Sequence, residues 1–376
     1  MVTRLNSNSF VPGKCPLLVI KVGSSLLVDS EGKLHRKWLE TLVADIADRH
    51  QAGQRIIIVT SGAIALGARK LGLSKGGRAS LADAQAAAST GQIMLSGAWA
   101  GLLDAKGLAA AQILVTLDDL EDRRRYLNIA ATLDRLLSAG AVPVINENDS
   151  VATEEIRFGD NDRLAARVAQ AAGANGVILL SDVDGLYDRD PADPAAAIIP
   201  YIAKVDDGIR AVAMAGSASG MGSGGMHSKL DAAQISSLAG ILLAIISGKH
   251  DHPLQRFAGG GPGTVFAADE SKGARKNWLG GRLTAKGRIF VDKGAASAMA
   301  KGGSLLPAGA ITVEGTFARG DVVDIVHDGK CVARGLTEYG VDDALLIYGK
   351  QSGDLEKILG TVPRNVLVHR DQLVML

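Results

Sequence analysis

Short apolar runs rich in β-branched residues alternate with helical stretches rich in alanine and leucine from residue 17 to residue 268. This alternation is typical of a mostly parallel β-sheet that is sandwiched between helices. The expected strands are Leu17–Val22, Ile56–Thr60, Ala110–Val115, Val142–Asn146, Val177–Ser181 and Ile241–Ser247. We therefore predict an α/β domain over residues 16–268.

Polar residues stand at or just beyond the ends of most of these strands. The carboxyl ends of parallel strands meet at one edge of a sheet, and ligands bind there. The residues concerned are Lys21, Thr60-Ser61, Asn146, Ser181-Asp182 and Ser247-Gly248. The sequence thus predicts an active site along this edge.

The overall charge excludes some classes of partner. The chain has 41 lysine and arginine residues against 40 aspartates and glutamates, so it has no general field that attracts nucleic acid or anionic lipid. Cys15 and Cys331 form no CxxC or Cys/His cluster, which argues against a disulfide framework and structural zinc. No apolar run approaches the roughly 20 residues that span a bilayer. We expect a cytoplasmic protein with no membrane contact.

The pattern changes after residue 268. Residues 269–285 predict a linker, and residues 286–376 show short strands broken by glycine and aspartate turns, as in a small β-barrel with one helix near Ala295–Lys301. The strands expected here are Arg288–Val291, Ile311–Val313, Val322–Val326, Val332–Gly335, Leu345–Tyr348 and Val366–His369. Residues 1–15 are expected to form a disordered tail.

The segment Gly159–Leu164 places two carboxylates and an amide at the start of an expected helix. Aspartate and asparagine are common helix caps, so capping alone is one interpretation. The other is that the cluster faces a ligand. Asn146–Asp149, directly after an expected buried strand, allows the same two interpretations, an Asx-rich turn or a site for a polar substrate.

A loop from Gly216 to Gly225 contains five glycines in ten residues and precedes an expected helix. Glycine-exposed backbone amides and a helix N-terminus together bind phosphate, and Lys229 just inside the helix would reach over the same amides. The alternative is a flexible surface loop. The spacing matches neither the Walker loop nor the dinucleotide fingerprint. The triplet His250-Asp251-His252 is expected to face solvent.

Several of these segments resemble the glutamate 5-kinase family of the amino-acid kinase superfamily. The resemblance runs through Val19–Ser25, Val59–Ala65, Val142–Ala152, Glu155–Leu164, Leu179–Tyr187 and Ser219–Leu230, and Ile289–Ala295 and Gly303–Pro307 resemble a C-terminal PUA domain. It implies ATP-dependent phosphorylation of the γ-carboxylate of L-glutamate in proline biosynthesis. It also implies Mg²⁺ with ATP, feedback inhibition by proline with Val151–Gly159 as a movable lid, and a homo-oligomer.

The resemblance implies roles for individual residues. Expected glutamate contacts are Ser61, Asp149 and Asn161, supported by Asn146 and Asp160. Expected nucleotide contacts are Lys21, Ser181, Asp182, Ser223, Gly224, Gly225, Met226, His227, Ser228 and Lys229. Asp162 resembles the carboxylate that holds the two lysines in place. The region His250–Gly261, expected to form a wall of the nucleotide pocket, departs from the family pattern.

The residue types fit this chemistry. A γ-carboxylate with a pKa of about 4.3 is already ionised at neutral pH, so it needs no general base. Lys21 and Lys229 would instead offset the repulsion between this carboxylate and the triphosphate.

Two other functions remain open from the sequence. Acetylglutamate or aspartate kinases would share the sheet pattern. A PUA domain could also bind RNA, although residues 286–376 carry 11 basic and 11 acidic side chains and therefore no basic excess, so a nucleic-acid partner is not expected.

Overall fold

The computed structural model describes residues 6–29, 31–151, 160–215, 223–269, 285–360, 362 and 364–376. The chain divides into two compact units, one made of residues 1–120 and 129–269 and the other of residues 121–128 and 270–376. The expected linker lies almost wholly outside the described residues. Our boundaries at residues 16–268 and 286–376 stay a prediction.

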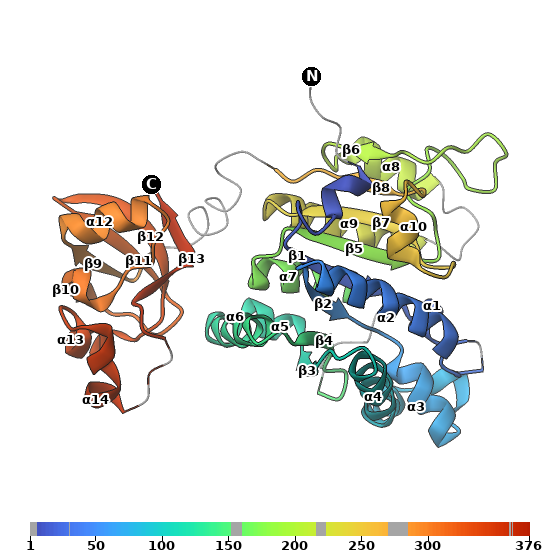
Figure 1. Cartoon of the computed structure of the whole chain (residues 1–376), viewed down its shortest axis with the longest axis horizontal. Helices are drawn as coiled ribbons and strands as arrows, with labels where there is room; N and C mark the ends of the chain where they lie inside the picture. Colours follow the sequence, from blue (N-terminus) through green and yellow to red (C-terminus); the bar gives the residue numbers. More distant parts are fainter. Residues whose placement is uncertain are drawn as a thin grey trace. The chain divides into compact units, whose positions relative to one another are not determined.

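The first unit is built on an eight-stranded sheet with the order β3-β4-β2-β1-β5-β7-β8-β6 (Figure 1). All neighbouring strands are parallel except β7 and β8, which are antiparallel. The strands are β1 (Leu17–Val22), β2 (Arg55–Val59), β3 (Ala110–Val115), β4 (Val142–Glu147), β5 (Gly176–Ser181), β6 (Tyr201–Ile202), β7 (Leu242–Ser247) and β8 (Thr264–Phe266). The predicted α/β architecture is confirmed, with β1 near the middle of the sheet.

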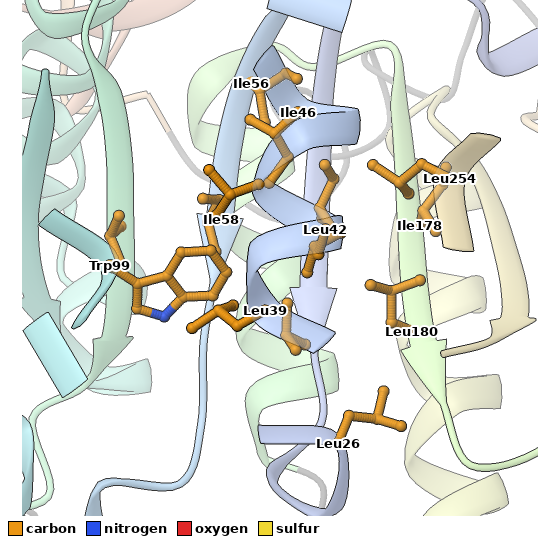
Figure 2. Packing of buried hydrophobic residues seen from close by; sticks show 14 of the residues in the cluster. Leu26, Leu39, Leu42, Ile46, Ile56, Ile58, Trp99, Ile178, Leu180 and Leu254 are labelled. Carbon is orange, nitrogen blue, oxygen red and sulfur yellow. The ribbon is translucent and has the colours of Figure 1, made fainter. Parts of the chain in front are cut away.

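Helices pack on both faces of this sheet. On one face, Leu39, Leu42 and Ile46 of α2 contact alternate residues of β1, β2 and β5 in a continuous apolar core that α4 and α10 extend (Figure 2). Helices α7 and α9 contact each other and the strands from the opposite side. The helices of this unit are α1 (Ser24–Leu27), α2 (Arg36–Gln51), α3 (Ala63–Leu71), α4 (Leu81–Asp104), α7 (Asp160–Ala172), α8 (Asp207–Ala215), α9 (Ser223–Leu238) and α10 (Pro253–Ala258). Helices α5 (Leu117–Glu121) and α6 (Arg123–Ser138) belong to it except for residues 121–128, which are assigned to the second unit. Two 3₁₀ turns, η1 (Ser7–Phe10) and η2 (Ser74–Gly77), complete the first unit.

Helices α3 and α4 cross with their backbones in contact. A Cβ atom on Gly67 would lie 1.8 Å from the carbonyl oxygen of Ala87, and one on Gly91 would lie 1.8 Å from that of Ala63. No side chain fits at either position. The crossing therefore fixes α4 against the turn that leads from β2 into α3.

The structure corrects the expected disordered tail over residues 6–15, and residues 1–5 lie outside the described residues. Residues 7–10 form η1, and the side chain of Phe10 is fully buried in the sheet core. The carbonyl oxygen of Phe10 accepts hydrogen bonds from Arg49 Nη1 at 2.9 Å and Gln54 Nε2 at 3.0 Å. Burial of this aromatic ring ties residues 7–15 to the domain.

The triplet His250-Asp251-His252 is only partly solvent-facing. His252 Nδ1 lies 2.8 Å from Oδ1 of Asp45, a buried carboxylate on α2, although the imidazole itself is 46% exposed. Asp45 Oδ2 also accepts the backbone N–H groups of Leu254 at 2.9 Å and Gln255 at 3.1 Å. Asp45 thereby caps α10 from a distant helix, which a local sequence pattern could not reveal.

The second unit contains a five-stranded sheet with the order β10-β9-β11-β12-β13, in which only β9 and β11 are parallel. Its strands are β9 (Gly287–Val291), β10 (Ala310–Gly315), β11 (Val322–His327), β12 (Lys330–Thr337) and β13 (Val368–Met375). Its helices are α12 (Lys293–Ala300), η3 (Pro307–Gly309), α13 (Val341–Ile347), η4 (Ser352–Asp354) and α14 (Leu355–Leu359). The expected helix after β9 is confirmed as α12.

One predicted strand of this unit is wrong. Leu345–Tyr348 overlaps the end of α13, in which Ala344 and Ile347 are buried and Leu345 and Leu346 are exposed. Buried positions three residues apart follow the period of a helix, and two aspartates in the first turn favour its N-terminus. The last strand also starts later than expected, at Val368.

Within the described parts of the chain, no helix is long and apolar enough to cross a membrane.

Candidate active site

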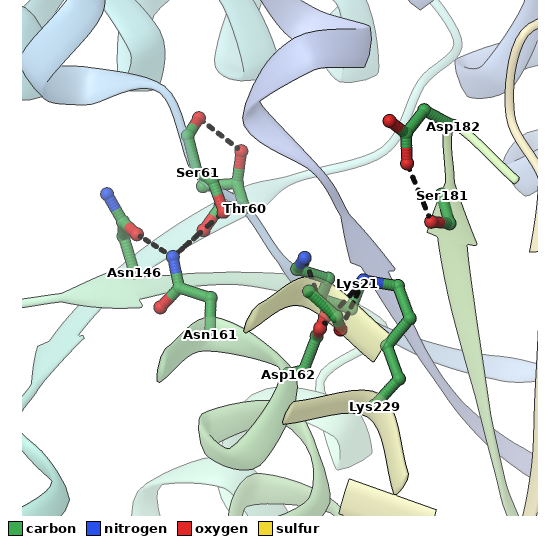
Figure 3. A network of polar contacts seen from close by, with 10 residues as sticks. Lys21, Thr60, Ser61, Asn146, Asn161, Asp162, Ser181, Asp182 and Lys229 are labelled. Carbon is green, nitrogen blue, oxygen red and sulfur yellow. Dashed lines mark hydrogen bonds and ion pairs between the residues drawn. The ribbon is translucent and has the colours of Figure 1, made fainter. Parts of the chain in front are cut away.

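Two lysines from distant parts of the chain meet one buried aspartate at the carboxyl edge of the sheet (Figure 3). Lys21, near the end of β1, places Nζ 2.6 Å from Asp162 Oδ1. Lys229 of α9 donates from Nζ to Asp162 Oδ2 at 3.0 Å and to the carbonyl oxygen of Gly225 at 3.2 Å. The structure thus brings together the three residues expected to be catalytic.

Burial and charge shift the ionisation of this cluster. Asp162 is fully buried, and Lys21 and Lys229 are buried with it. Burial alone would raise the pKa of Asp162, but the two ammonium groups together lower it below its ordinary value. Burial lowers the pKa of Lys21, with a smaller opposing effect of Asp162 and a further lowering by Lys229. The cluster holds two cationic groups against one carboxylate in a site largely closed to water.

A second polar network lies beside the first, at the ends of β2 and β4. Asn161, next to Asp162 at the start of α7, donates from Nδ2 to the carbonyl oxygen of Thr60 at 2.9 Å and to Ser61 Oγ at 2.9 Å. It also donates to Asn146 Oδ1 at 3.2 Å. The structure therefore brings together two expected glutamate contacts, Ser61 and Asn161, and the expected supporting residue Asn146.

The turn into α3 depends on Gly62. Its φ of 97° lies in the left-handed region, which favours glycine, and a Cβ atom there would lie 3.0 Å from Val28 Cγ2. The turn begins directly after β2 and holds Ser61 within reach of Asn161. The other two residues expected at the substrate site are Asp149 and Asp160. Asp149 is half-buried in the turn after β4 and interacts with the charge of Arg78, and Asp160 is the first residue of α7, its side chain outside the described part.

The expected nucleotide contacts lie at the end of β5 and at the start of α9. Ser181 is buried at the end of β5 and donates from Oγ to Asp182 Oδ1 at 3.2 Å. In the first turns of α9, Gly225 and Met226 are half-buried and Ser228 is buried. His227 is exposed, with Nε2 3.7 Å from Asp231 Oδ2. Ser223 and Gly224 begin α9, and most of the glycine-rich loop before them lies outside the described residues.

The carboxylates of this site do not form a metal cage. No cluster of three or more His, Cys, Asp or Glu side chains that could bind a metal occurs among the residues that the structure describes. Asp162 is already engaged by two ammonium groups, which leaves Asp182 as the described carboxylate beside the lysines. A single available carboxylate is too few ligands for a Mg²⁺ ion bound by the protein alone. It fits a Mg²⁺ ion that binds together with the phosphates of a nucleotide.

Two residues that contact the site, Trp99 and Gln92, were not expected from the sequence. Trp99 Nε1 donates to Thr60 Oγ1 at 3.0 Å, with both side chains buried, and Gln92 Oε1 accepts from Asn146 Nδ2 at 2.8 Å. Both come from α4, which carries no acidic motif near them. The only local signal was a pair of polar residues, Gln92 and Ser96, spaced to share one face of a helix.

The fold and the site define a class of protein, and comparison with known families identifies it. The model of the amino acid kinase family matches residues 16–247 and that of the PUA domain matches residues 287–359. The chain therefore belongs to the amino acid kinase family.

Curated relatives narrow the class to glutamate 5-kinases. The glutamate 5-kinase of Sphingopyxis alaskensis is 61% identical over 368 residues, which cover 98% of this chain and 99% of that one. The glutamate 5-kinase of Zymomonas mobilis is 59% identical over 373 residues, 99% of this chain and 94% of that one. That of Novosphingobium aromaticivorans is 60% identical over 363 residues, 96% of each chain. These matches confirm the resemblance inferred from the sequence motifs.

Proposed function

We propose that this chain transfers the γ-phosphoryl group of ATP to the γ-carboxylate of L-glutamate and so forms L-glutamate 5-phosphate, the first step of proline biosynthesis. The observation that carries the proposal is the convergence of Lys21 and Lys229 on Asp162 in a chain about 60% identical to glutamate 5-kinases. The reaction is an in-line displacement. A γ-carboxylate oxygen forms a bond to the γ-phosphorus, the bond to the β,γ-bridging oxygen breaks, and ADP leaves with that electron pair.

The main barrier in this reaction is electrostatic, because one anion must approach another. No proton has to be removed from the nucleophile, which is ionised at neutral pH. Two ammonium groups beside the transferred phosphoryl group would offset the repulsion. An ammonium about 4 Å from a unit charge is worth roughly 4 kcal/mol at an effective dielectric near 20. Only the part of this attraction that increases in the transition state accelerates the reaction.

In this proposal Asp162 positions the lysines rather than reacting. A carboxylate that contacts both ammonium groups keeps them close together before the nucleotide binds, so little reorganisation is needed during the reaction. Asp162 is therefore a positioning residue, and Lys21 and Lys229 are the catalytic residues.

The polar network at the ends of β2 and β4 is assigned to glutamate, with Ser61, Asp149 and Asn161 in contact and Asn146 and Asp160 in support. This assignment is supported by Asn161, which belongs to the network and directly precedes Asp162 in α7, so the network lies beside the lysine cluster. Ser181, Asp182 and residues 223–229 are assigned to the nucleotide. Mg²⁺ bound to the phosphates would neutralise part of their charge.

Regulation by proline and assembly into a homo-oligomer are further parts of the proposal. Both derive from the family resemblance, and residues 152–159 of the proposed lid lie outside the described residues. Competition is expected at the glutamate pocket, so proline should raise the apparent KM for glutamate and leave kcat unchanged. A fall in kcat with a constant KM for glutamate would show that proline binds outside the glutamate pocket.

An assay that traps the acyl phosphate tests substrate and reaction together. Purified protein is incubated with ATP, Mg²⁺ and hydroxylamine, and hydroxamate is measured with glutamate, aspartate, N-acetylglutamate or carbamate as acceptor. We expect product with glutamate and at least 100-fold lower kcat/KM with the others. N-acetylglutamate and carbamate lack the free ammonium group of glutamate, and aspartate is one methylene too short to place its ammonium group and its side-chain carboxylate where glutamate places them. Preference for N-acetylglutamate or aspartate would instead assign one of the related kinase activities.

A further inference from the structure

A chain of amide groups runs from the candidate substrate site into helix α4. It links Asn161, Asn146, Gln92 and Ser96 through side-chain hydrogen bonds (the first two residues are seen in Figure 3). Gln92 and Ser96 lie one turn apart on α4 and are half-buried. No catalytic role explains this extension beyond Asn146.

A backbone carbonyl sets the orientation of every amide in the chain. The carbonyl oxygen of Thr60 can only accept, so Asn161 must present Nδ2 to it, at 2.9 Å. The same nitrogen then faces Asn146, which must present Oδ1, at 3.2 Å. Asn146 Nδ2 is consequently turned toward Gln92 Oε1, at 2.8 Å, and Gln92 Nε2 toward Ser96 Oγ, at 3.0 Å.

This orientation leaves one acceptor available. Asn161 Nδ2 has three acceptors within hydrogen-bond distance, whereas Asn161 Oδ1 is buried and has no hydrogen-bond partner among the described residues. A buried acceptor without a donor destabilises a protein unless a ligand or an ordered water satisfies it, and a substrate ammonium group that displaces such a water would donate to it. If the amide of Asn146 turned over, its Nδ2 would oppose Asn161 Nδ2, and the orientation of Asn161 would lose one of its three supports.

We propose that Gln92 is a positioning residue of the substrate site, which accepts from Asn146 Nδ2 and so keeps Asn161 Oδ1 available to accept a hydrogen bond from the substrate's ammonium group. The proposal rests on the proposed function, since glutamate supplies that ammonium group. Gln92 does not touch the reacting atoms in this account and acts through Asn146.

A purely structural role for Gln92 is disfavoured by the packing of α4. The helix is held in the core by Leu95, Trp99, Leu102 and Leu103, all of them buried. The residue next to Gln92, Ile93, is 77% exposed, so this part of the helix lies at the surface of the unit. An apolar replacement at position 92 should therefore leave the fold intact.

Two substitutions at position 92 separate the acceptor role from the volume of the side chain. Gln92→Leu has a similar volume and no acceptor, whereas Gln92→Glu retains an oxygen for Asn146 Nδ2 and can accept from Ser96. We expect Gln92→Leu to raise the KM for glutamate about 10-fold, with kcat and the KM for ATP within about 2-fold of the wild type, the pattern of lost ground-state binding. Gln92→Glu should stay within about 3-fold of the wild type in all three parameters.

Ser96→Ala is the graded control, because it removes only the last partner of the chain and should raise the KM for glutamate less than Gln92→Leu. Thermal unfolding of each variant is measured alongside. An unchanged KM for glutamate in Gln92→Leu, equal effects of the leucine and glutamate replacements, or a parallel loss of kcat and stability would each overturn the assignment. A wild type that forms no hydroxamate from glutamate would instead refute the proposed function, so the two failures are distinguishable.

Discussion

Asp162 and Lys229 stand 67 positions apart in the sequence, yet Asp162 Oδ2 lies 3.0 Å from Lys229 Nζ. Helix α7 supplies the carboxylate and helix α9 the ammonium group, and the two helices pack together against the sheet. Lys21 reaches the other oxygen of the same carboxylate from β1. Three elements must therefore be correctly packed before the site exists.

Removal of either lysine should reduce turnover. We expect Lys21→Met and Lys229→Met each to lower kcat by roughly 10²-fold or more, as for other electrostatic stabilisers of a transition state. Steady-state kinetics with varied ATP and glutamate provide the measurement. Lys106→Met is the control, because Lys106 is exposed in the turn that leads into β3, at the opposite edge of the sheet. A change confined to the KM for ATP would contradict the catalytic role.

The coupling between Asp162 and the lysines should appear in a double-mutant cycle. Asp162→Asn alone should reduce kcat because it releases both ammonium groups. The double variant Asp162→Asn/Lys229→Met should then lose far less kcat than the product of the losses in the two single variants. Multiplicative effects would show that Asp162 acts independently of Lys229.

The same aspartate should contribute to stability. Asp162→Asn leaves two buried ammonium groups without their carboxylate, a change that typically costs about 3–5 kcal/mol in the free energy of unfolding. Urea unfolding at pH 7 measures it. Asp104→Asn, at an exposed position at the end of α4, should change the free energy by about 0.5 kcal/mol or less.

The stabilisation by Asp162 should depend on pH. Its pKa in the folded chain is lowered below 3.8, so the folded state binds this proton more weakly than the unfolded state does. The contribution is therefore fully present above the unfolded pKa of about 3.9 and is lost as the pH falls through the folded value. The difference in unfolding free energy between the wild type and Asp162→Asn should be constant from about pH 5 to 7 and decrease below about pH 4. A difference that grows on acidification would refute the lowered pKa.

Two glycines of α4 should respond oppositely to the same substitution. Gly91→Ala places a methyl group against the backbone of α3, so we expect strong destabilisation or no folded protein. A methyl group on Gly97 would meet no atom within 4 Å, and Gly97→Ala should stabilise the helix by up to about 1 kcal/mol. Thermal melts of the two variants give the comparison, and equal effects would contradict the close crossing of α3 and α4.

The two cysteines should differ in reactivity. Burial raises the pKa of the Cys15 thiol to about 12, despite smaller opposing effects of Arg49 and Gln54. Partial burial and the neighbouring Asp324 also raise the pKa of the Cys331 thiol, but Cys331 is exposed to reagents whereas Cys15 is buried. Because the thiolate is the reactive form, a thiol reagent at pH 8 should label native protein at Cys331 alone and label Cys15 only after unfolding. Cys331→Ser should abolish labelling of the native protein. Native labelling that survives this substitution would mean that residues 7–15 do not stay packed.

Local pattern was a good guide to the sheet of the first unit. The six strands expected there all occur, because buried parallel strands have continuous apolar sequences that differ from the flanking helices. Their ends also located Lys21, Asn146 and Ser181, since a parallel sheet brings its carboxyl ends to one edge. Local pattern was a poorer guide to short segments. The apolar run Leu345–Tyr348 has only four residues, too few to distinguish a strand from the end of a helix.

The amino-acid sequence by itself determined the α/β architecture, the edge of the sheet that carries the site and the residue types available there. These properties follow from periodicity and composition over short stretches of chain. Only the tertiary structure decided that Asp162 contacts both lysines, that Phe10 enters the core and that Gln92 accepts a hydrogen bond from Asn146. Such contacts join residues far apart in the sequence, and they form only when the packing of helices against the sheet has fixed the distances between them.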